Sequence, residues 1–218
     1  MTRLTVAALV VLVWSASPVW ALKRFMIMGD SIQAGTGLTN ASSLTSNLLS
    51  STASVIVHNF SSPGARMTDV GFFPGMTHDG PCVQQVQGFF GMQGVMITLG
   101  TNDWAGGVDV NTFLNAYTAL LNGIPAGIPV VCVTPIWRSD ETTPNATSGL
   151  VLDHIRFTAA VACAQKGFPS INGSLLVPHD RAYYSEPPNA VALHPNDLGH
   201  MAMATNLRQQ LTSIGWLP

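Results

Sequence analysis

A serine, a glycine, an asparagine and a histidine stand at four separate points of this chain and carry groups that could act together. Ser31 follows Gly-Asp, and a serine held at a turn after a strand can expose its hydroxyl as a nucleophile. His194 precedes Pro-Asn, and its imidazole could accept the hydroxyl proton. Gly64 could bring a bare backbone N–H close to a substrate oxygen, and the Asn102 amide could donate to an oxyanion. Together these groups would suit acyl transfer, although each residue type is also common in turns and helix caps.

Hydrophobic patterning predicts the strands and helices that would position those four residues. Short apolar runs predict strands over residues 25–28, 55–57, 95–99, 129–134 and 171–177. Helices are predicted over residues 43–50, 83–90, 109–121, 149–166 and 195–214, the last with Pro195 at an early helical position. Residues 61–81 are rich in Gly, Pro and Ser and are interpreted as a long functional loop.

Apolar strands that alternate with helices indicate a parallel sheet covered on both faces, which is a three-layer α/β domain. In such a sheet the ligand site lies beyond the carboxyl ends of the strands. Ser31, Gly64 and Asn102 follow the first, second and third predicted strands, so all three are expected at that edge.

The composition fits one globular domain and excludes two other classes of protein. Hydrophobic residues make up 47% of the 218 residues, which is too many for a disordered chain and enough for one buried core. The net charge of −2 provides no basic field, which argues against nucleic acid as a partner. Charged residues are only 9%, so uncharged polar residues and glycine must form much of the surface.

The first 21 residues are interpreted as a signal peptide and residues 22–218 as the mature domain. Arg3 supplies a positive start, residues 4–14 are apolar, and Val19-Trp20-Ala21 offers small residues at the positions that a signal peptidase reads. The apolar run is shorter than the ~20 residues that a spanning helix needs. We therefore expect a secreted or periplasmic protein with no stable membrane insertion after cleavage.

Three cysteines, Cys82, Cys132 and Cys163, allow at most one internal disulfide. The sequence leaves the pairing open, because Cys132 and Cys163 could equally be small core residues. No Cys-x-x-Cys pair or His-rich spacing suggests a metal site, and no cofactor is expected.

In chain order, the four segments resemble the sequence blocks of the SGNH hydrolase (GDSL-type esterase and lipase) family. The resemblance runs from Gly29 to His200 and so covers nearly all of the expected mature chain. It implies a flavodoxin-like α/β/α sandwich whose five parallel strands have the order 2-1-3-4-5. The matching residues are Gly29-Asp30-Ser31, the loop glycine Gly64, Gly100-x-Asn102-Asp103 and His194-Pro195-Asn196.

The family resemblance also implies a role for each matching residue. Ser31 matches the nucleophile and His194 the general base. The oxyanion hole would consist of the backbone N–H groups of Ser31 and Gly64 and the side chain of Asn102. The substrate would be a small-molecule, lipid or carbohydrate ester.

The chain departs from the family pattern at Val191, where an aspartate usually stands three residues before the histidine. A valine side chain cannot orient or charge-stabilise an imidazole. The Val191 carbonyl could accept the Nδ1–H and leave a Ser-His dyad, or Asp180 or Glu186 could fold back to replace the missing acid. The valine could also be a deliberate substitution of the natural residue. Alternatively, it could belong to a catalytically impaired relative that binds a carbohydrate or a protein partner, which is the alternative function.

Other polar and aromatic residues near the blocks have interpretations of their own. Asp30 is expected to turn away from the site and fix its loop, and His200 to be structural on the last helix. Asp197 should interact with the N-terminus of that helix. Five loop aromatics could line an acyl or sugar pocket or simply pack beneath loops: Phe72, Phe73, Trp104, Trp137 and Tyr183.

Overall fold

The chain folds around a five-stranded parallel sheet, as the alternation of strands and helices predicts. The computed structural model describes residues 23–52, 55–68 and 92–217, so the expected signal peptide, the predicted helix over 83–90, Phe72, Phe73 and Cys82 lie outside the described residues. The strand order is β2-β1-β3-β4-β5, which confirms the predicted topology. The strands are β1 (Lys23–Gly29), β2 (Val55–Asn59), β3 (Gly94–Thr98), β4 (Val130–Val133) and β5 (Ser170–Ile171).

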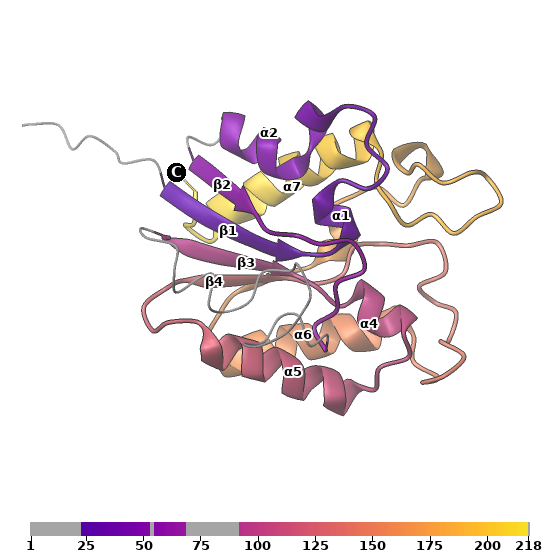
Figure 1. Cartoon of the computed structure of the whole chain (residues 1–218), viewed down its shortest axis with the longest axis horizontal. Helices are drawn as coiled ribbons and strands as arrows, with labels where there is room; N and C mark the ends of the chain where they lie inside the picture. The colour runs from indigo at the N-terminus through magenta and orange to yellow at the C-terminus, as the bar shows by residue number, and fades with distance from the viewer. Residues whose placement is uncertain (1–22, 53–54, 69–91, 218) are drawn as a thin grey trace, which may run out of the picture.

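Helices cover both faces of the sheet and make the three layers (Figure 1). The first face is covered by α2 (Thr45–Thr52) and α7 (Asp197–Ser213), which pack against each other. On the opposite face lie α4 (Thr101–Ala105), α5 (Val110–Gly123) and α6 (Leu152–Gln165). Short helices complete the fold: α1 (Ser31–Ala34), η1 (Ala41–Ser43), η3 (Gly173–Leu175) and η4 (Arg181–Tyr183).

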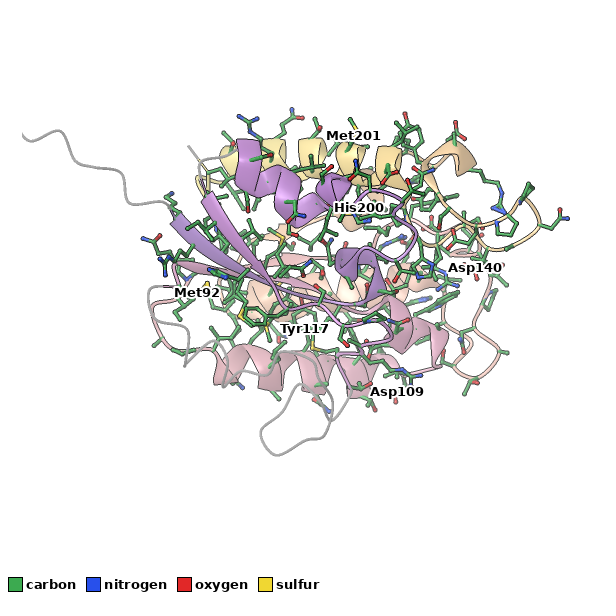
Figure 2. The ribbon with its side chains drawn as sticks, turned by 45° about the horizontal axis from the view of Figure 1, so that its top comes forward. Met92, Asp109, Tyr117, Asp140, His200 and Met201 are labelled. Atoms are coloured by element: carbon green, nitrogen blue, oxygen red, sulfur yellow. A yellow bond between two sulfur atoms is a disulfide. The ribbon has the colours of Figure 1, made fainter. Side chains whose placement is uncertain are left out.

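Two hydrophobic clusters fill the spaces between the layers. Successive side chains of a strand point to opposite faces, so Met26 and Met28 of β1 join one cluster while Phe25 and Ile27 join the other. Tyr117 of α5 is fully buried in the first cluster and lies between its helix and the sheet (Figure 2). Both faces of β1 are therefore apolar, which explains why it reads as a continuous hydrophobic run.

Cys132 of β4 and Cys163 of α6 form a disulfide, with their Cα atoms 6.5 Å apart. Both residues are fully buried, and the bond ties α6 to the sheet. The sequence left this pairing open. Among the described residues, no helix is both long enough and apolar enough to cross a bilayer.

Most of the predicted elements differ from the observed ones by one or two residues at their ends. Three of the differences have a local hydrogen bond beside them. The fifth strand ends at Ile171 rather than at 177, since the Asn172 side chain accepts from Ser174 N and starts a 3₁₀ turn. The last helix begins at Asp197, because Asn196 is its N-cap, so Pro195 precedes the helix instead of lying inside it. The helix predicted from 149 begins at Leu152, after a loop in which the Asn145 side chain accepts from two backbone N–H groups.

Candidate active site

Ser31 lies where β1 ends, as the first residue of α1, at the carboxyl edge of the sheet (Figure 1). Asp30 caps this short helix, its side chain accepting from Ile32 N at 3.0 Å. Gly29 has no room for a side chain, because a Cβ there would lie 2.4 Å from Thr98 Oγ1 and 2.8 Å from Ser61 Oγ. The tight turn that presents Ser31 therefore depends on a glycine at 29.

The Ser31 hydroxyl contacts the imidazole of His194, with 3.0 Å between Oγ and Nε2. The two residues are 163 positions apart in the chain and meet because His194 stands just before α7. The His194 side chain is 23% exposed, so one side of the pair is open to an incoming molecule. Sequence-predicted nucleophile and base are thus within hydrogen-bonding distance of each other.

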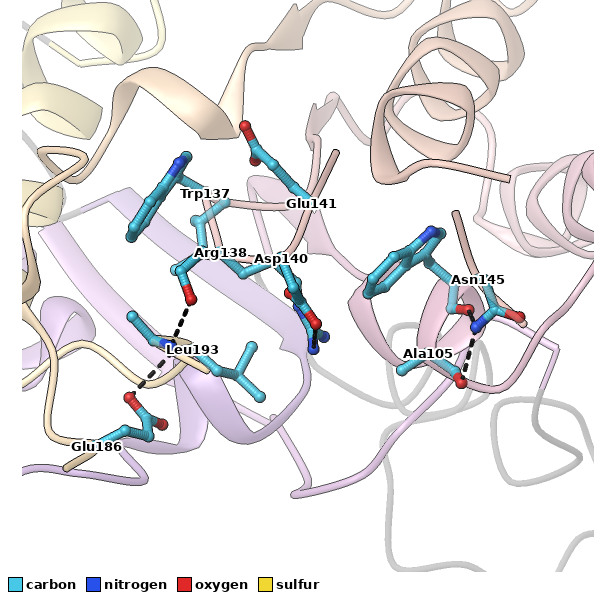
Figure 3. Close-up of polar contacts among 12 residues, drawn as sticks. Ala105, Trp137, Arg138, Asp140, Glu141, Asn145, Glu186 and Leu193 are labelled. Atoms are coloured by element: carbon cyan, nitrogen blue, oxygen red, sulfur yellow. Dashed lines mark hydrogen bonds and ion pairs between the residues drawn. The ribbon is translucent and has the colours of Figure 1, made fainter. Parts of the chain in front are cut away.

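Glu186 contacts Nδ1, the other ring nitrogen of His194. Its Oε1 lies 2.6 Å from Nδ1 and also accepts from the His194 backbone N–H at 2.8 Å. Its Oε2 accepts from Leu193 N at 3.0 Å (Figure 3). A carboxylate in this position favours the tautomer with hydrogen on Nδ1, which leaves Nε2 free to accept the Ser31 proton.

The protonation state of Glu186 follows from the same contacts. Partial burial opposes ionisation, but the N–H groups of Leu193, His194 and Glu186 itself and the imidazole outweigh it, so the pKa lies below its ordinary value. Glu186 is therefore a carboxylate at neutral pH and can stabilise a positive charge on the ring.

Of the other replacements considered for the missing aspartate, Asp180 lies elsewhere. Its side chain caps η4 and accepts from Ala182 N at 2.9 Å. Val191 is 38% exposed, and its carbonyl is not needed as the acceptor of Nδ1–H because Glu186 already contacts that nitrogen. Of the two carboxylates considered as replacements, the structure therefore brings Glu186, and not Asp180, to His194 Nδ1.

Gly64 and Asn102 come from neighbouring segments that contact each other. Gly64 lies in an exposed turn with φ of +79°, a left-handed conformation that favours glycine. The Asn102 side chain donates to Ala65 O at 3.1 Å, which uses one of its two amide hydrogens; the other has no acceptor among the described residues. Ser31 N belongs to the first turn of a helix, where N–H groups have no intrahelical acceptor.

A residue without an assigned role, Asp103, holds the Gly64 loop in place. Its carboxylate accepts from Met67 N at 2.8 Å, from Thr68 N at 3.0 Å and from Thr68 Oγ1 at 2.8 Å. At the other end of the loop, Ser62 N donates to Gly29 O at 3.0 Å, beside the nucleophile. The sequence offers one sign of this role. Asp103 follows Asn102 in the third block, and aspartate side chains readily accept hydrogen bonds from backbone N–H groups of turns.

Two buried carboxyl groups lie behind the site. Asp30 is 1% exposed, and burial raises its pKa to about 7. Burial also raises the pKa of Asp103, more than its hydrogen bonds lower it. Asp30 contacts the backbone of its own turn, as expected.

His200 and Asp197 lie on α7 away from the reacting groups. His200 is fully buried between α7 and α2, where its Nδ1 is 2.8 Å from Thr45 Oγ1 (Figure 2). Burial lowers its pKa to about 4, so the ring is neutral. Asp197 accepts from Asn40 N at 3.1 Å and from Thr39 Oγ1, so it fastens the segment after the nucleophile to the last helix.

Of the aromatics expected in loops, Trp104 lies on α4 and Tyr183 on η4, so the loop assignment of these two was wrong. Trp104 and Trp137 pack against protein groups. Trp104 is buried, and the Arg138 guanidinium lies 4.6 Å from its ring centroid. Trp137 stacks on His179, with centroids 5.1 Å apart, and touches Tyr184. Both contacts favour the packing interpretation of these aromatics over a role in an open pocket.

The sequence profile of the GDSL-like Lipase/Acylhydrolase family matches residues 27–202, which include Ser31, Gly64, Asn102 and His194. The chain belongs to this family. Members of the GDSL-like family are hydrolases, so ester hydrolysis is the general activity and small-molecule esters are the general substrates. The resemblance to SGNH hydrolases is thereby confirmed.

Solved structures agree with the GDSL fold. A lipase/acylhydrolase from Enterococcus faecalis is similar with a TM-score of 0.66 and 18% identity, over 90% of this chain and 98% of that one. The salicylyl-acyltransferase SsfX3 from a tetracycline biosynthetic pathway has a TM-score of 0.74 and 15% identity. This chain is covered over 90% in that match but spans only 56% of the acyltransferase. A search of curated protein sequences finds no match.

Proposed function

We propose that this chain is an exported carboxylic ester hydrolase that works through an acyl-enzyme on Ser31. The observation that carries the proposal is the unbroken series of contacts from Ser31 Oγ to His194 Nε2 and from His194 Nδ1 to Glu186. A nucleophile, a base and an acid that orients the base are the three components that serine acyl transfer needs.

In the proposed reaction, Ser31 Oγ attacks the ester carbonyl while His194 Nε2 takes the hydroxyl proton. The resulting imidazolium is stabilised by the Glu186 carboxylate, which keeps its charge throughout. His194 then gives the proton to the leaving alcohol, and water attacks the acyl-enzyme by the same route. The tetrahedral oxyanion would be held by the N–H groups of Ser31 and Gly64 and by the Asn102 amide, each worth about 3–4 kcal/mol of barrier.

The alternative, a non-catalytic binding protein on the same fold, relied on the loss of the acid at Val191. The contact between Glu186 and His194 weighs against it, because that carboxylate can serve the imidazole as an aspartate would. Export is proposed from the apolar leader alone.

The test is hydrolysis of p-nitrophenyl esters, from acetate to long acyl chains, by residues 22–218 and by the Ser31→Ala variant. Ser51→Ala is a matched control, because Ser51 is an exposed serine on α2 that loses the same hydroxyl. We expect turnover in the wild type and the control and none above background in Ser31→Ala. Equal turnover in wild type and Ser31→Ala would refute Ser31 as the nucleophile, and no activity of either on any ester would favour the binding alternative.

A further inference from the structure

Arg181 donates three hydrogen bonds to backbone carbonyls of the loop that carries Glu186. Its Nε donates to Pro188 O at 3.2 Å, its Nη2 donates to Pro187 O at 3.0 Å, and Nη2 also donates to Ala190 O. All three acceptors lie between Glu186 and His194 in the chain. The guanidinium is therefore bonded to the middle of the segment that joins the acid to the base.

The two ends of this loop, residues 186–193, are held by other groups. Ser185, just before the loop, contacts His194, just after it: Ser185 N and Oγ donate to His194 O at 2.9 and 3.2 Å. On the His194 side, Ser139 pairs with Ala192, donating through N at 3.1 Å and accepting at Oγ at 2.9 Å. Neither contact reaches residues 187–190, which are the residues that Arg181 engages.

Within residues 187–190 the loop has one backbone hydrogen bond of its own, from Ala190 N to Pro187 O at 2.9 Å. Pro187 and Pro188 have no N–H, so they can take part in hydrogen bonds only through their carbonyl oxygens. Residues 187–190 are exposed, and without Arg181 the carbonyls of Pro188 and Ala190 would bond to water, while Pro187 O would keep only the bond from Ala190 N. Since the Glu186 carboxylate enters from this loop and not from the residue three before His194, its place on the ring depends on the path of the loop.

We propose that Arg181 is a positioning residue for the reaction, whose guanidinium fixes the loop of residues 186–193 so that Glu186 stays on His194 Nδ1. The inference rests on the proposed function of Ser31, His194 and Glu186. Arginine suits the task because its planar fork presents several N–H groups to carbonyls that lie in different directions. A lysine ammonium is a compact point charge and cannot reproduce that arrangement.

The experiment measures kcat and KM on p-nitrophenyl acetate for Arg181→Ala, Arg181→Lys, Glu186→Gln and the Arg181→Ala/Glu186→Gln double variant. Arg208→Ala on α7 is the control, because it removes the same charge from another exposed position. We expect Arg181→Ala to lower kcat by about 10- to 100-fold with KM within about twofold, since a shift of about 1 Å in a catalytic group has effects of this size. Arg181→Lys should recover little of the loss, and Arg208→Ala should match the wild type.

The double variant separates positioning from a general structural role. If Arg181 acts through Glu186, removing it from the Glu186→Gln background should lower kcat by less than about twofold. The downfield proton resonance of His194 Nδ1–H, expected in the wild type, should broaden or vanish in Arg181→Ala.

Equal losses in the two backgrounds, or a kcat for Arg181→Ala within about twofold of the wild type, would overturn the inference. Should Arg181→Ala fail to fold, Arg181→Lys decides, because it keeps the stem and charge, and wild-type kcat there would overturn the inference. Ser31→Ala distinguishes the two levels of failure. If it abolishes turnover while Arg181→Ala keeps a kcat within about twofold of the wild type, only the positioning role is wrong, whereas activity retained in Ser31→Ala removes the proposed function as well.

Discussion

Replacing Glu186 by glutamine is the change that most directly separates a triad from a dyad in this chain. The carboxylate accepts from three N–H groups: His194 Nδ1 at 2.6 Å, His194 N at 2.8 Å and Leu193 N at 3.0 Å. A glutamine has one carbonyl oxygen and one NH2 group, so it cannot accept from all three. In either orientation of the amide, at least one of these hydrogen bonds is lost.

If the amide oxygen takes the place of Oε1, the NH2 group faces the N–H of Leu193 and the ring loses its negative partner. If the NH2 takes that place, Nδ1 must become the acceptor and the hydrogen moves to Nε2, which then cannot take the Ser31 proton. The second orientation corresponds to the wrong tautomer, which lowers kcat by about 10⁴ in a serine triad. We therefore expect kcat to fall by about 10² to 10⁴, or roughly 3–5 kcal/mol of barrier, with little change in KM.

The assay is steady-state hydrolysis of p-nitrophenyl acetate, with Asp180→Asn as the matched control. Asp180 is the other carboxylate that could have replaced the aspartate, and an asparagine can still cap η4 in its place. The control should stay within about twofold of the wild type. A Glu186→Gln enzyme with more than half of the wild-type kcat would refute the assignment of the acid, and partial recovery on adding Val191→Asp would support it.

Three further predictions remain, two from the structure and one from the sequence. Gly37→Ala should lower kcat, because residue 37 has φ of +96° and a Cβ there would lie 3.2 Å from His194 Cβ; a wild-type kcat would show that this contact does not set the ring position. The buried His200 has a pKa of about 4 against 6.5 when unfolded, so the unfolded state binds more protons and stability should fall by about 3 kcal/mol as pH drops from 6.5 to 4. Urea unfolding of wild type and His200→Gln across that range isolates the effect, since Asp30 titrates in the opposite direction in both, and identical pH slopes would contradict it. N-terminal sequencing of the exported protein should begin at Leu22, and an intact Met1 would contradict cleavage after Ala21.

The parallel sheet follows from the sequence because parallel strands buried on both faces leave a simple hydrophobic signature, whereas the strand order was implied only by the family resemblance. The exception is the fifth strand, which has only two residues. Its apolar continuation, Leu176 and Val177, is buried in loop structure after a 3₁₀ turn, and hydrophobicity alone does not distinguish a buried strand from a buried turn.

Ser31 and His194, the proposed nucleophile and base, were picked out in the sequence by the family motifs, and each stands next to a fixed element boundary, the end of β1 and the start of α7. Glu186 could only be offered as one of several alternatives. It reaches His194 through the closure of a proline-containing loop, which depends on contacts from Arg181, Ser185 and Ser139. No periodicity or spacing encodes such contacts.

The central claim, that Ser31 is the activated nucleophile of an ester hydrolase, is tested most directly by reaction with a fluorophosphonate probe followed by mass spectrometry. The account predicts one adduct per chain, located on the peptide that contains Ser31, formed more slowly in Glu186→Gln and absent in Ser31→Ala. The absence of any adduct on the folded wild type, or an adduct on another residue, would contradict it.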